Sequence, residues 1–194
     1  MDEYLAELHR SAAVLLSRTI ALVSAADLER PTPCAGWDVS ALLAHQSGQE
    51  RGFLMAAVGG GAPLTAWRPL EVAPDRLIAA IHTTDRALRS PTVVARLWVP
   101  EISRSRLPWE TAVTAHVLDL VVHGWDLAVA LGSVLAVPDP LVALVLEVAS
   151  AIPDDESRGT MFAPALPAAE GDDFSRALRL LGRDPAWVPQ PAAR

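Results

Sequence analysis

The chain contains no lysine and no asparagine, and it has a single cysteine, Cys34, among its 194 residues. One cysteine cannot form a disulfide within the chain, which fits a reducing compartment. The N-terminus, Met-Asp-Glu-Tyr, is acidic and lacks the basic and apolar segments of a signal peptide. We therefore expect a cytoplasmic protein.

Positive charge is also scarce. The 16 basic residues are all arginine, and acidic residues outnumber them, so that the formal net charge is −7. A protein that binds nucleic acid needs a stripe of cationic side chains to neutralise the phosphates. We therefore expect no nucleic-acid partner.

No uninterrupted apolar run is long enough to cross a membrane. The most apolar region, residues 108–132, is interrupted by Asp119, His123 and Asp126, and charged groups are costly inside a bilayer. We therefore expect no membrane partner. Hydrophobic residues nevertheless make up 51% of the chain, which predicts a globular protein. The length is sufficient for one sizeable core, so we expect a single domain over residues 1–194.

The spacing of the apolar residues predicts an all-α protein. Asp2 and Asp38 stand where N-terminal helix caps are expected. Residues 92–107 alternate weakly between apolar and polar side chains and could form a short β-ribbon. The predicted helices cover residues 2–25, 39–58, 74–89 and 108–131, followed by a helix that opens at 138–140 and a short final one over 174–181.

The helix over 108–131 is apolar on nearly all sides, which predicts that it is buried. One stripe along it nevertheless carries His116, Asp119 and His123, at positions that share a helix face. Because burying such groups without partners costs several kcal/mol, this stripe must meet a partner.

Asp119 and His123 are four residues apart, so both side chains reach one point beside the helix. Carboxylate and imidazole are good ligands for Zn²⁺ and similar divalent ions, and His45 from another helix would complete a set of three. Three protein ligands with one open position are typical of a catalytic metal site. Alternatively, Asp119 accepts a hydrogen bond from His123 and no metal is involved. The spacing alone leaves both interpretations open.

Three segments carry a resemblance to a known family. The first is Pro-Thr-Pro-Cys-Ala-Gly-Trp-Asp-Val at 31–39, followed by Leu-Leu-Ala-His at 42–45. The second is His-Gly-Trp-Asp-Leu-Ala-Val-Ala-Leu-Gly at 123–132, and the third is Leu-Gly-Arg-Asp-Pro-Ala-Trp at 181–187. Together they resemble the DinB-like superfamily, and within it the metal-binding domain of mycothiol-dependent maleylpyruvate isomerase.

This resemblance implies an antiparallel four-helix bundle with a divalent metal ion, Zn²⁺ or Ni²⁺, on His45, Asp119 and His123. The isomerase has glutamate where this chain has Asp119, so a carboxylate is retained on a shorter side chain. The resemblance also implies a low-molecular-weight thiol, mycothiol or a similar compound, that binds the open metal position as a thiolate. A homodimer is a further expectation from the resemblance.

The implied activity is that of an S-transferase or an isomerase. The thiolate would add to a small electrophilic substrate, giving S-transfer or, by reversible addition, cis–trans isomerisation. A non-catalytic module that binds a metal or a small ligand needs the same ligand set. The sequence therefore does not distinguish an enzyme from a non-catalytic binding module.

Two residues beside the trio are candidates for the chemistry. His116, one turn before Asp119, could support a ligand, contact the substrate or be an alternative ligand, and we expect it to act in catalysis. Gln49, one turn after His45, is a candidate to bind the thiol cofactor on the pocket side of the metal.

Other noticeable residues have structural interpretations. Asp126 is expected to pair with an arginine such as Arg183, because an unpaired buried carboxylate is costly. Trp37 is expected to pack in the core. Cys34 could be a nucleophile, but we expect a small packed residue. His9 is expected to be a solvated surface histidine.

Overall fold

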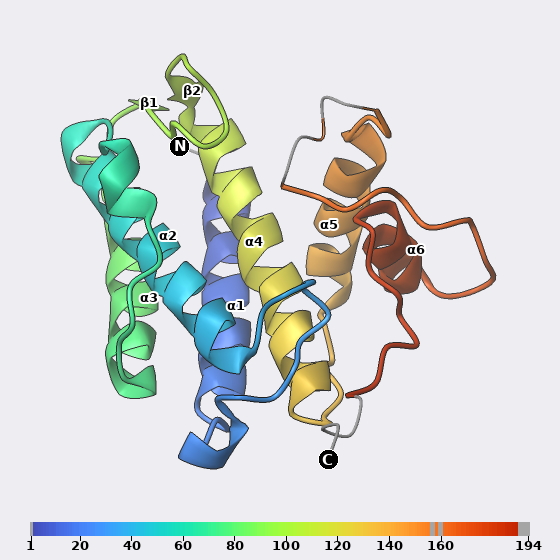
Figure 1. Ribbon diagram of the computed structural model, residues 1–194. Coiled ribbons are helices and arrows are strands. Elements are labelled where there is room, and N and C mark those ends of the chain that lie inside the picture. The colour runs from blue at the N-terminus through green and yellow to red at the C-terminus, as the bar shows by residue number, and fades with distance from the viewer. Residues whose placement is uncertain (1, 156–157, 159–160, 190–194) are drawn as a thin grey trace.

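The computed structural model describes residues 2–155, 158 and 161–189, and the regular secondary structure of this part of the chain is helical apart from one small ribbon (Figure 1). The predicted all-α class, the extra C-terminal helices and the short β-ribbon are confirmed. The elements in chain order are α1 (Glu3–Ile20), the 3-10 turn η1 (Ala25–Asp27), α2 (Val39–Gly59), the 3-10 turn η2 (Leu64–Trp67), α3 (Pro74–Leu88), β1 (Arg96–Leu97), β2 (Leu107–Pro108), α4 (Trp109–Ala130), α5 (Asp139–Ala151) and α6 (Asp173–Leu180).

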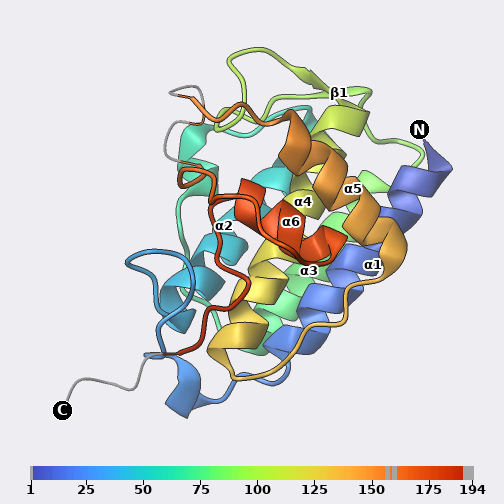
Figure 2. The same cartoon turned by 90° about the vertical axis from the view of Figure 1, so that its right-hand side faces the viewer.

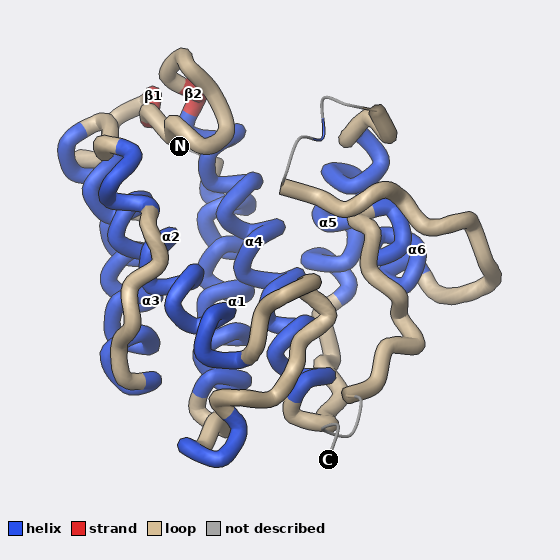
Figure 3. Tube along the Cα trace, in the orientation of Figure 1, coloured by secondary structure: helices blue, strands red, loops and turns tan. Residues whose placement is uncertain are grey.

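The first four α-helices form a bundle, which the tube in Figure 3 shows. Contacts between their residues indicate two parallel pairs that run in opposite directions. α1 and α4 run the same way, since His9 meets His116 and, further along both helices, Leu16 lies beside Gly124. α2 and α3 form the other pair. The expected antiparallel four-helix bundle is therefore confirmed, and its antiparallel neighbours include α2 and α4, which carry the predicted site.

The long connection over residues 60–73 explains why α2 and α3 are parallel. It runs back along α2, where the guanidinium group of Arg51 donates hydrogen bonds to three of its backbone carbonyls. The approach is close, because a Cβ at Gly48 would lie 2.6 Å from the carbonyl oxygen of Arg68. The chain thus returns to the beginning of α2 before α3 starts.

Aspartate side chains cap the helices where the sequence predicts them. Asp2 accepts hydrogen bonds from two backbone N–H groups of the first turn of α1, and Asp38 accepts one in α2. Asp172 caps α6 in the same way. These caps satisfy N–H groups that have no partner within the helix, which explains why the helices begin at these residues.

The first helix is shorter than predicted. α1 ends at Ile20, whereas apolar spacing predicted a helix to residue 25. The carboxylate of Asp27 accepts hydrogen bonds from both the backbone N–H and the hydroxyl group of Ser24. This local capping starts η1 and takes the chain out of α-helical geometry.

α4 is the core helix of the protein. It has the length and mean hydropathy of a membrane span, but 78% of its most apolar window is buried inside the protein, as expected for the central helix of a bundle. α5 and α6 pack against each other and α5 also contacts α4 and α1, which Figure 2 shows from the side. The segment after α6 returns to α4 beside the predicted site.

Candidate metal centre

The three predicted ligands come together where α2 crosses α4. The Nε2 atom of His45 lies 3.3 Å from Oδ1 of Asp119, and Nε2 of His123 lies 3.4 Å from the same oxygen. One ligand atom from each of the three residues lies within 4.8 Å of the other two. We call His45, Asp119 and His123 the ligand trio.

The two separations from Oδ1 of Asp119 fit a tetrahedral metal ion. Ligands about 2.0–2.2 Å from a tetrahedral ion lie roughly 3.3–3.6 Å from one another. Two imidazole nitrogens and one carboxylate oxygen suit Zn²⁺ and similar divalent ions. The three side chains retain exposed fractions of 19%, 22% and 11%, so one side of the trio faces solvent. The trio can therefore hold an ion and leave a position open for an exchangeable ligand.

Charge within the trio also favours a cation. Burial alone would raise the pKa of Asp119, but the neighbouring His123 and His45 outweigh burial and lower it. Burial alone would lower the pKa of His45, but the hydrogen bond and the charge of Asp119 outweigh burial and raise it. Asp119 is thus ionised at neutral pH. Without a metal, the hydrogen bond between Asp119 and His45 and the ion-pair contact of Asp119 with His123 also bring these side chains together. The geometry therefore suits both a metal site and a metal-free cluster.

The second oxygen of Asp119 is held by Gln46. The amide nitrogen of Gln46 donates a hydrogen bond of 2.7 Å to Oδ2, which leaves Oδ1 to face the two imidazoles. The sequence interpretation missed Gln46. Its position next to His45 on an apolar helix could have indicated a role at the site. Its partner, Asp119, is evident only from the way α2 crosses α4.

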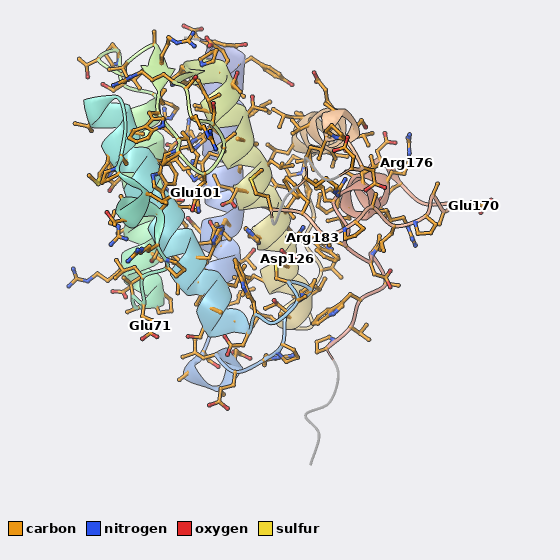
Figure 4. All side chains as sticks on the ribbon, turned by 45° about the horizontal axis from the view of Figure 1, so that its top comes forward. Glu71, Glu101, Asp126, Glu170, Arg176 and Arg183 are labelled. Carbon is orange, nitrogen blue, oxygen red and sulfur yellow. The ribbon has the colours of Figure 1, made fainter. Side chains whose placement is uncertain are left out.

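His123 is oriented by a buried carboxylate behind it. Its Nδ1 atom lies 2.9 Å from Oδ2 of Asp126, so that this nitrogen donates and Nε2 is free to face the ligand trio. Asp126 also accepts hydrogen bonds from Arg183, at 3.0 Å from Nε and 3.0 Å from Nη2. Figure 4 shows Arg183 reaching Asp126 from the segment that follows α6. The predicted pairing of Asp126 with Arg183 is confirmed.

A second group of potential ligands is less suited to a metal. Cys34, His123 and Asp126 also lie within 4.8 Å of one another. Burial, and then the charge of Asp126, raise the pKa of the Cys34 thiol to about 12. The thiol donates to Asp126 at 3.1 Å, and Arg183 already neutralises that carboxylate. Because a cation there would meet a guanidinium group, the ligand trio is the better candidate.

One aromatic ring lies against the two imidazoles of the trio. The ring of Trp37 is centred 4.9 Å from the ring of His45 and 6.0 Å from that of His123, nearly parallel to the latter. Trp37 was expected in the core, and it is half-buried against the core cluster. The structure adds that it restricts the orientation of both imidazoles.

Comparison with known proteins identifies the family. The family model for the mycothiol maleylpyruvate isomerase N-terminal domain matches residues 9–128, which is more than half of the chain and includes the whole ligand trio. The chain belongs to this family. Two curated relatives, the uncharacterised proteins MT0763 and Rv0738 of Mycobacterium tuberculosis, are each 27% identical over 166 residues, covering 82% of this chain and 84% of theirs.

Solved structures of the family support the fold. The crystal structure of the mycothiol-dependent maleylpyruvate isomerase superposes with a TM-score of 0.55 at 18% identity, covering 76% of this chain and 68% of that chain. A histidine-to-alanine mutant of that enzyme gives the same TM-score at 17% identity. At this identity the likeness establishes the shared helical fold.

The other two predicted site residues lie beside the trio in this family member. His116 is fully buried one turn before Asp119, with Nδ1 3.0 Å from Nε2 of His9 and Nε2 3.3 Å from the carboxylate of Glu50. Gln49 is buried, and its amide donates to Glu101 at 2.8 Å. Neither residue belongs to the trio, and their expected roles in catalysis and in thiol binding stay predictions.

The expectation for His9 is wrong. Its side chain is 1% exposed, and it contacts Asp85 and His116 rather than solvent. The signal was present in the sequence, because residues 5, 9, 12 and 16 lie on one face of α1 and the other three are apolar. A buried imidazole is stable there because both of its nitrogens have partners.

We expect Cys34→Ala to leave the metal content and any activity that depends on an added thiol unchanged. The Cys34 thiol is protonated and donates its hydrogen bond to Asp126. Loss of one small, half-buried group should lower the free energy of unfolding by about 1 kcal/mol. Elemental analysis, activity assays and denaturant unfolding measure the three quantities. An inactive variant that retains its metal and its fold would instead identify Cys34 as the nucleophile.

Proposed function

We propose that this protein binds a divalent metal ion at the ligand trio and uses it for thiol-dependent S-transfer or isomerisation of a small electrophilic substrate. The observation that carries the proposal is the convergence of His45, Asp119 and His123 within 4.8 Å of one another, with one side exposed. Both imidazole nitrogens lie at tetrahedral separations from Oδ1 of Asp119. Family membership supports it, because the family is described by a mycothiol-dependent isomerase.

The residues of the chain have separate tasks in this proposal. Asp119 supplies one negative charge through Oδ1, while Gln46 holds its other oxygen. Asp126 keeps the proton of His123 on Nδ1, so that Nε2 is available to a metal. Trp37 limits rotation of both imidazoles. A divalent ion at this trio would lower the pKa of a thiol bound at the open position, so that the thiol ionises near neutral pH.

The trio has the charge needed to hold a thiolate. With Asp119 ionised and both imidazoles neutral, a divalent ion in the trio leaves a net charge of +1, which one thiolate neutralises. A thiol held beside His45, Asp119 and His123 would supply a nucleophile for an electrophilic carbon of the substrate. This is the chemistry of S-transfer when the substrate carries a leaving group, and of cis–trans isomerisation when the addition to a double bond is reversible.

The proposal includes mycothiol or a similar low-molecular-weight thiol as cofactor, with Gln49 and His116 as the candidate contacts by helical spacing. It also includes a cytoplasmic location and a small-molecule substrate. Self-association as a homodimer is a prediction that light scattering would test.

The decisive experiment measures metal content first and thiol chemistry second. Protein purified without added metal should contain one Zn²⁺ or Ni²⁺ per chain by elemental analysis. The protein is then incubated with mycothiol and either a reactive electrophile, such as a haloarene or an epoxide, or a cis-configured maleyl compound. Conjugation of the electrophile or isomerisation of the maleyl compound should be faster than with metal-stripped protein.

The two readouts separate the candidate functions. Stoichiometric metal without acceleration of any thiol reaction would favour the non-catalytic binding module. Substoichiometric metal that cannot be restored by dialysis against Zn²⁺ or Ni²⁺ would show that the trio is only a hydrogen-bonded cluster.

A further inference from the structure

A second polar cluster is buried in the core, next to the ligand trio but separate from it. All four bundle helices contribute to it, and Arg89 lies just after the end of α3. The side chains of Glu50 and His116 have exposed fractions of 0%, that of His9 is 1% and that of Asp85 is 6%. Such groups are stable in a core only when hydrogen bonds satisfy them. The placement of the protons in this cluster therefore follows from its contacts.

Asp85 determines which nitrogen of His9 carries the proton. Arg89 donates hydrogen bonds to both carboxylate oxygens of Asp85, at 3.0 and 2.7 Å from the nearest nitrogens. Burial alone would raise the pKa of Asp85, but His9 and Arg89 outweigh burial and lower it to about 2. An ionised carboxylate can only accept, so the Nδ1 atom of His9, 3.0 Å away, carries a hydrogen and donates it.

His9 in turn determines the tautomer of His116. Burial lowers the pKa of His9, which keeps its imidazole neutral, so its Nε2 atom has a lone pair and accepts. The Nδ1 atom of His116, 3.0 Å from that lone pair, must therefore carry a hydrogen. This leaves Nε2 of His116 facing Oε1 of Glu50 at 3.3 Å.

The chain of contacts ends with atoms that lack partners. Among the described residues, Nε2 of His116 and both carboxylate oxygens of Glu50 are buried without a hydrogen bond. A bare nitrogen lone pair and a carboxylate that face each other in the core would both be acceptors. Unsatisfied buried acceptors are costly, and one proton between them removes the conflict.

We propose that Glu50 and His116 form a buried binding site for one proton, and that Asp85, acting through His9, is the positioning residue that directs the Nε2 atom of His116 to it. The proton lies between that nitrogen and the carboxylate. The pair is either a neutral acid with a neutral imidazole or a carboxylate with an imidazolium, and both forms contain the same number of protons.

The proton site adjoins the ligand trio along both helices. Gln46, which holds Asp119, lies one turn before Glu50 on α2, and His116 lies one turn before Asp119 on α4. The titratable and charged groups around the pair are His9 on α1, Asp85 on α3, Arg89 just after α3 and Asp119 on α4. A divalent ion in the trio would repel the proton, so metal binding should release it. This last consequence rests on the proposed function.

Metal-free protein tests the proton site alone. In the unfolded chain near pH 8, Glu50 is ionised and His116 is neutral, so the two groups hold no proton. The folded pair holds one, so the free energy of unfolding should fall as the pH rises above about 6.5. Glu50→Gln keeps the shape and can donate its amide hydrogen to His116, so it takes up no proton. Between pH 7 and 9, the folding equilibrium constant of the wild type should therefore fall about tenfold more per pH unit than that of Glu50→Gln.

Nitrogen-15 NMR of histidine-labelled wild type measures which ring nitrogens carry hydrogen, and it requires no folded variant. His9 should show hydrogen on Nδ1 and a lone pair on Nε2, and His116 should show hydrogen on Nδ1. Asp85→Asn should remove this preference in both rings, whereas His82→Gln, on a histidine outside the cluster, should change neither the spectra of the pair nor the proton uptake. A lone pair on Nδ1 of His116, or equal proton uptake by wild type and Glu50→Gln, would overturn the proposal.

Calorimetric titration with Zn²⁺ in two buffers of different ionisation enthalpy tests the link to the metal. The wild type should release more protons per bound ion than Glu50→Gln. Equal proton release would overturn the link while leaving the metal-free result in place. Absence of Zn²⁺ binding by the wild type would overturn the proposed function and the link together, and the proton site would still be decided by the metal-free measurements.

Discussion

Replacing Asp119 with asparagine is expected to weaken metal binding far more than it disturbs the fold. The amide preserves the shape of the side chain and can still accept the hydrogen bond of Gln46, but the trio loses its only negative charge. The affinity for Zn²⁺ should fall on the order of 100-fold or more, while the free energy of unfolding of the metal-free protein changes by about 1 kcal/mol. Calorimetric titration and denaturant unfolding measure the two effects.

Glu110→Gln is the matched control for this substitution. It exchanges a carboxylate for an amide on the same helix, in the exposed first turn of α4 and away from the trio. We expect it to leave the metal affinity unchanged. His45→Ala should lose the metal as Asp119→Asn does, because it removes a ligand from the opposite helix. Unchanged affinity in both site variants would contradict the assignment of the trio.

Asp126→Ala should have the largest effect on stability and should also reduce metal affinity. The carboxylate is fully buried and is shared by Arg183, His123 and the Cys34 thiol. Its removal leaves the buried guanidinium without a counter-charge, which should lower the free energy of unfolding by about 3–5 kcal/mol. For a chain of this length, that loss corresponds to a decrease in Tm of roughly 6–20 °C. The metal affinity should fall about 10–100-fold, because His123 loses the group that orients it.

The double variant Asp126→Ala/Arg183→Met separates these two effects. Removing both charges should recover most of the stability, since no unpaired ion remains in the core. It should not recover the metal affinity, because nothing then holds the proton of His123 on Nδ1. Differential scanning calorimetry and Zn²⁺ titration on the single and double variants provide the comparison. Recovery of affinity together with stability would show that Asp126 acts on the fold alone.

The helices could be predicted from the sequence because the features that determine them are local. Apolar spacing, the aspartate caps Asp2 and Asp38, and the proline and glycine residues between helices act within a few residues, so they can be read without the fold. The i, i+4 placement of Asp119 and His123 is local in the same sense. The end of α1 was misjudged because the side-chain hydrogen bonds of Asp27 compete with apolar periodicity.

The tertiary structure alone decided which groups meet between helices. Spacing on α4 could not show that His45 approaches Asp119 from α2, and the family resemblance supplied that expectation. No pattern indicated that His9 and Glu50 meet His116, because their partners are distant in sequence and depend on the direction of each helix. A helix determines which face its side chains occupy, whereas the crossing of α2 with α4 and the parallel alignment of α1 with α4 determine what that face contacts.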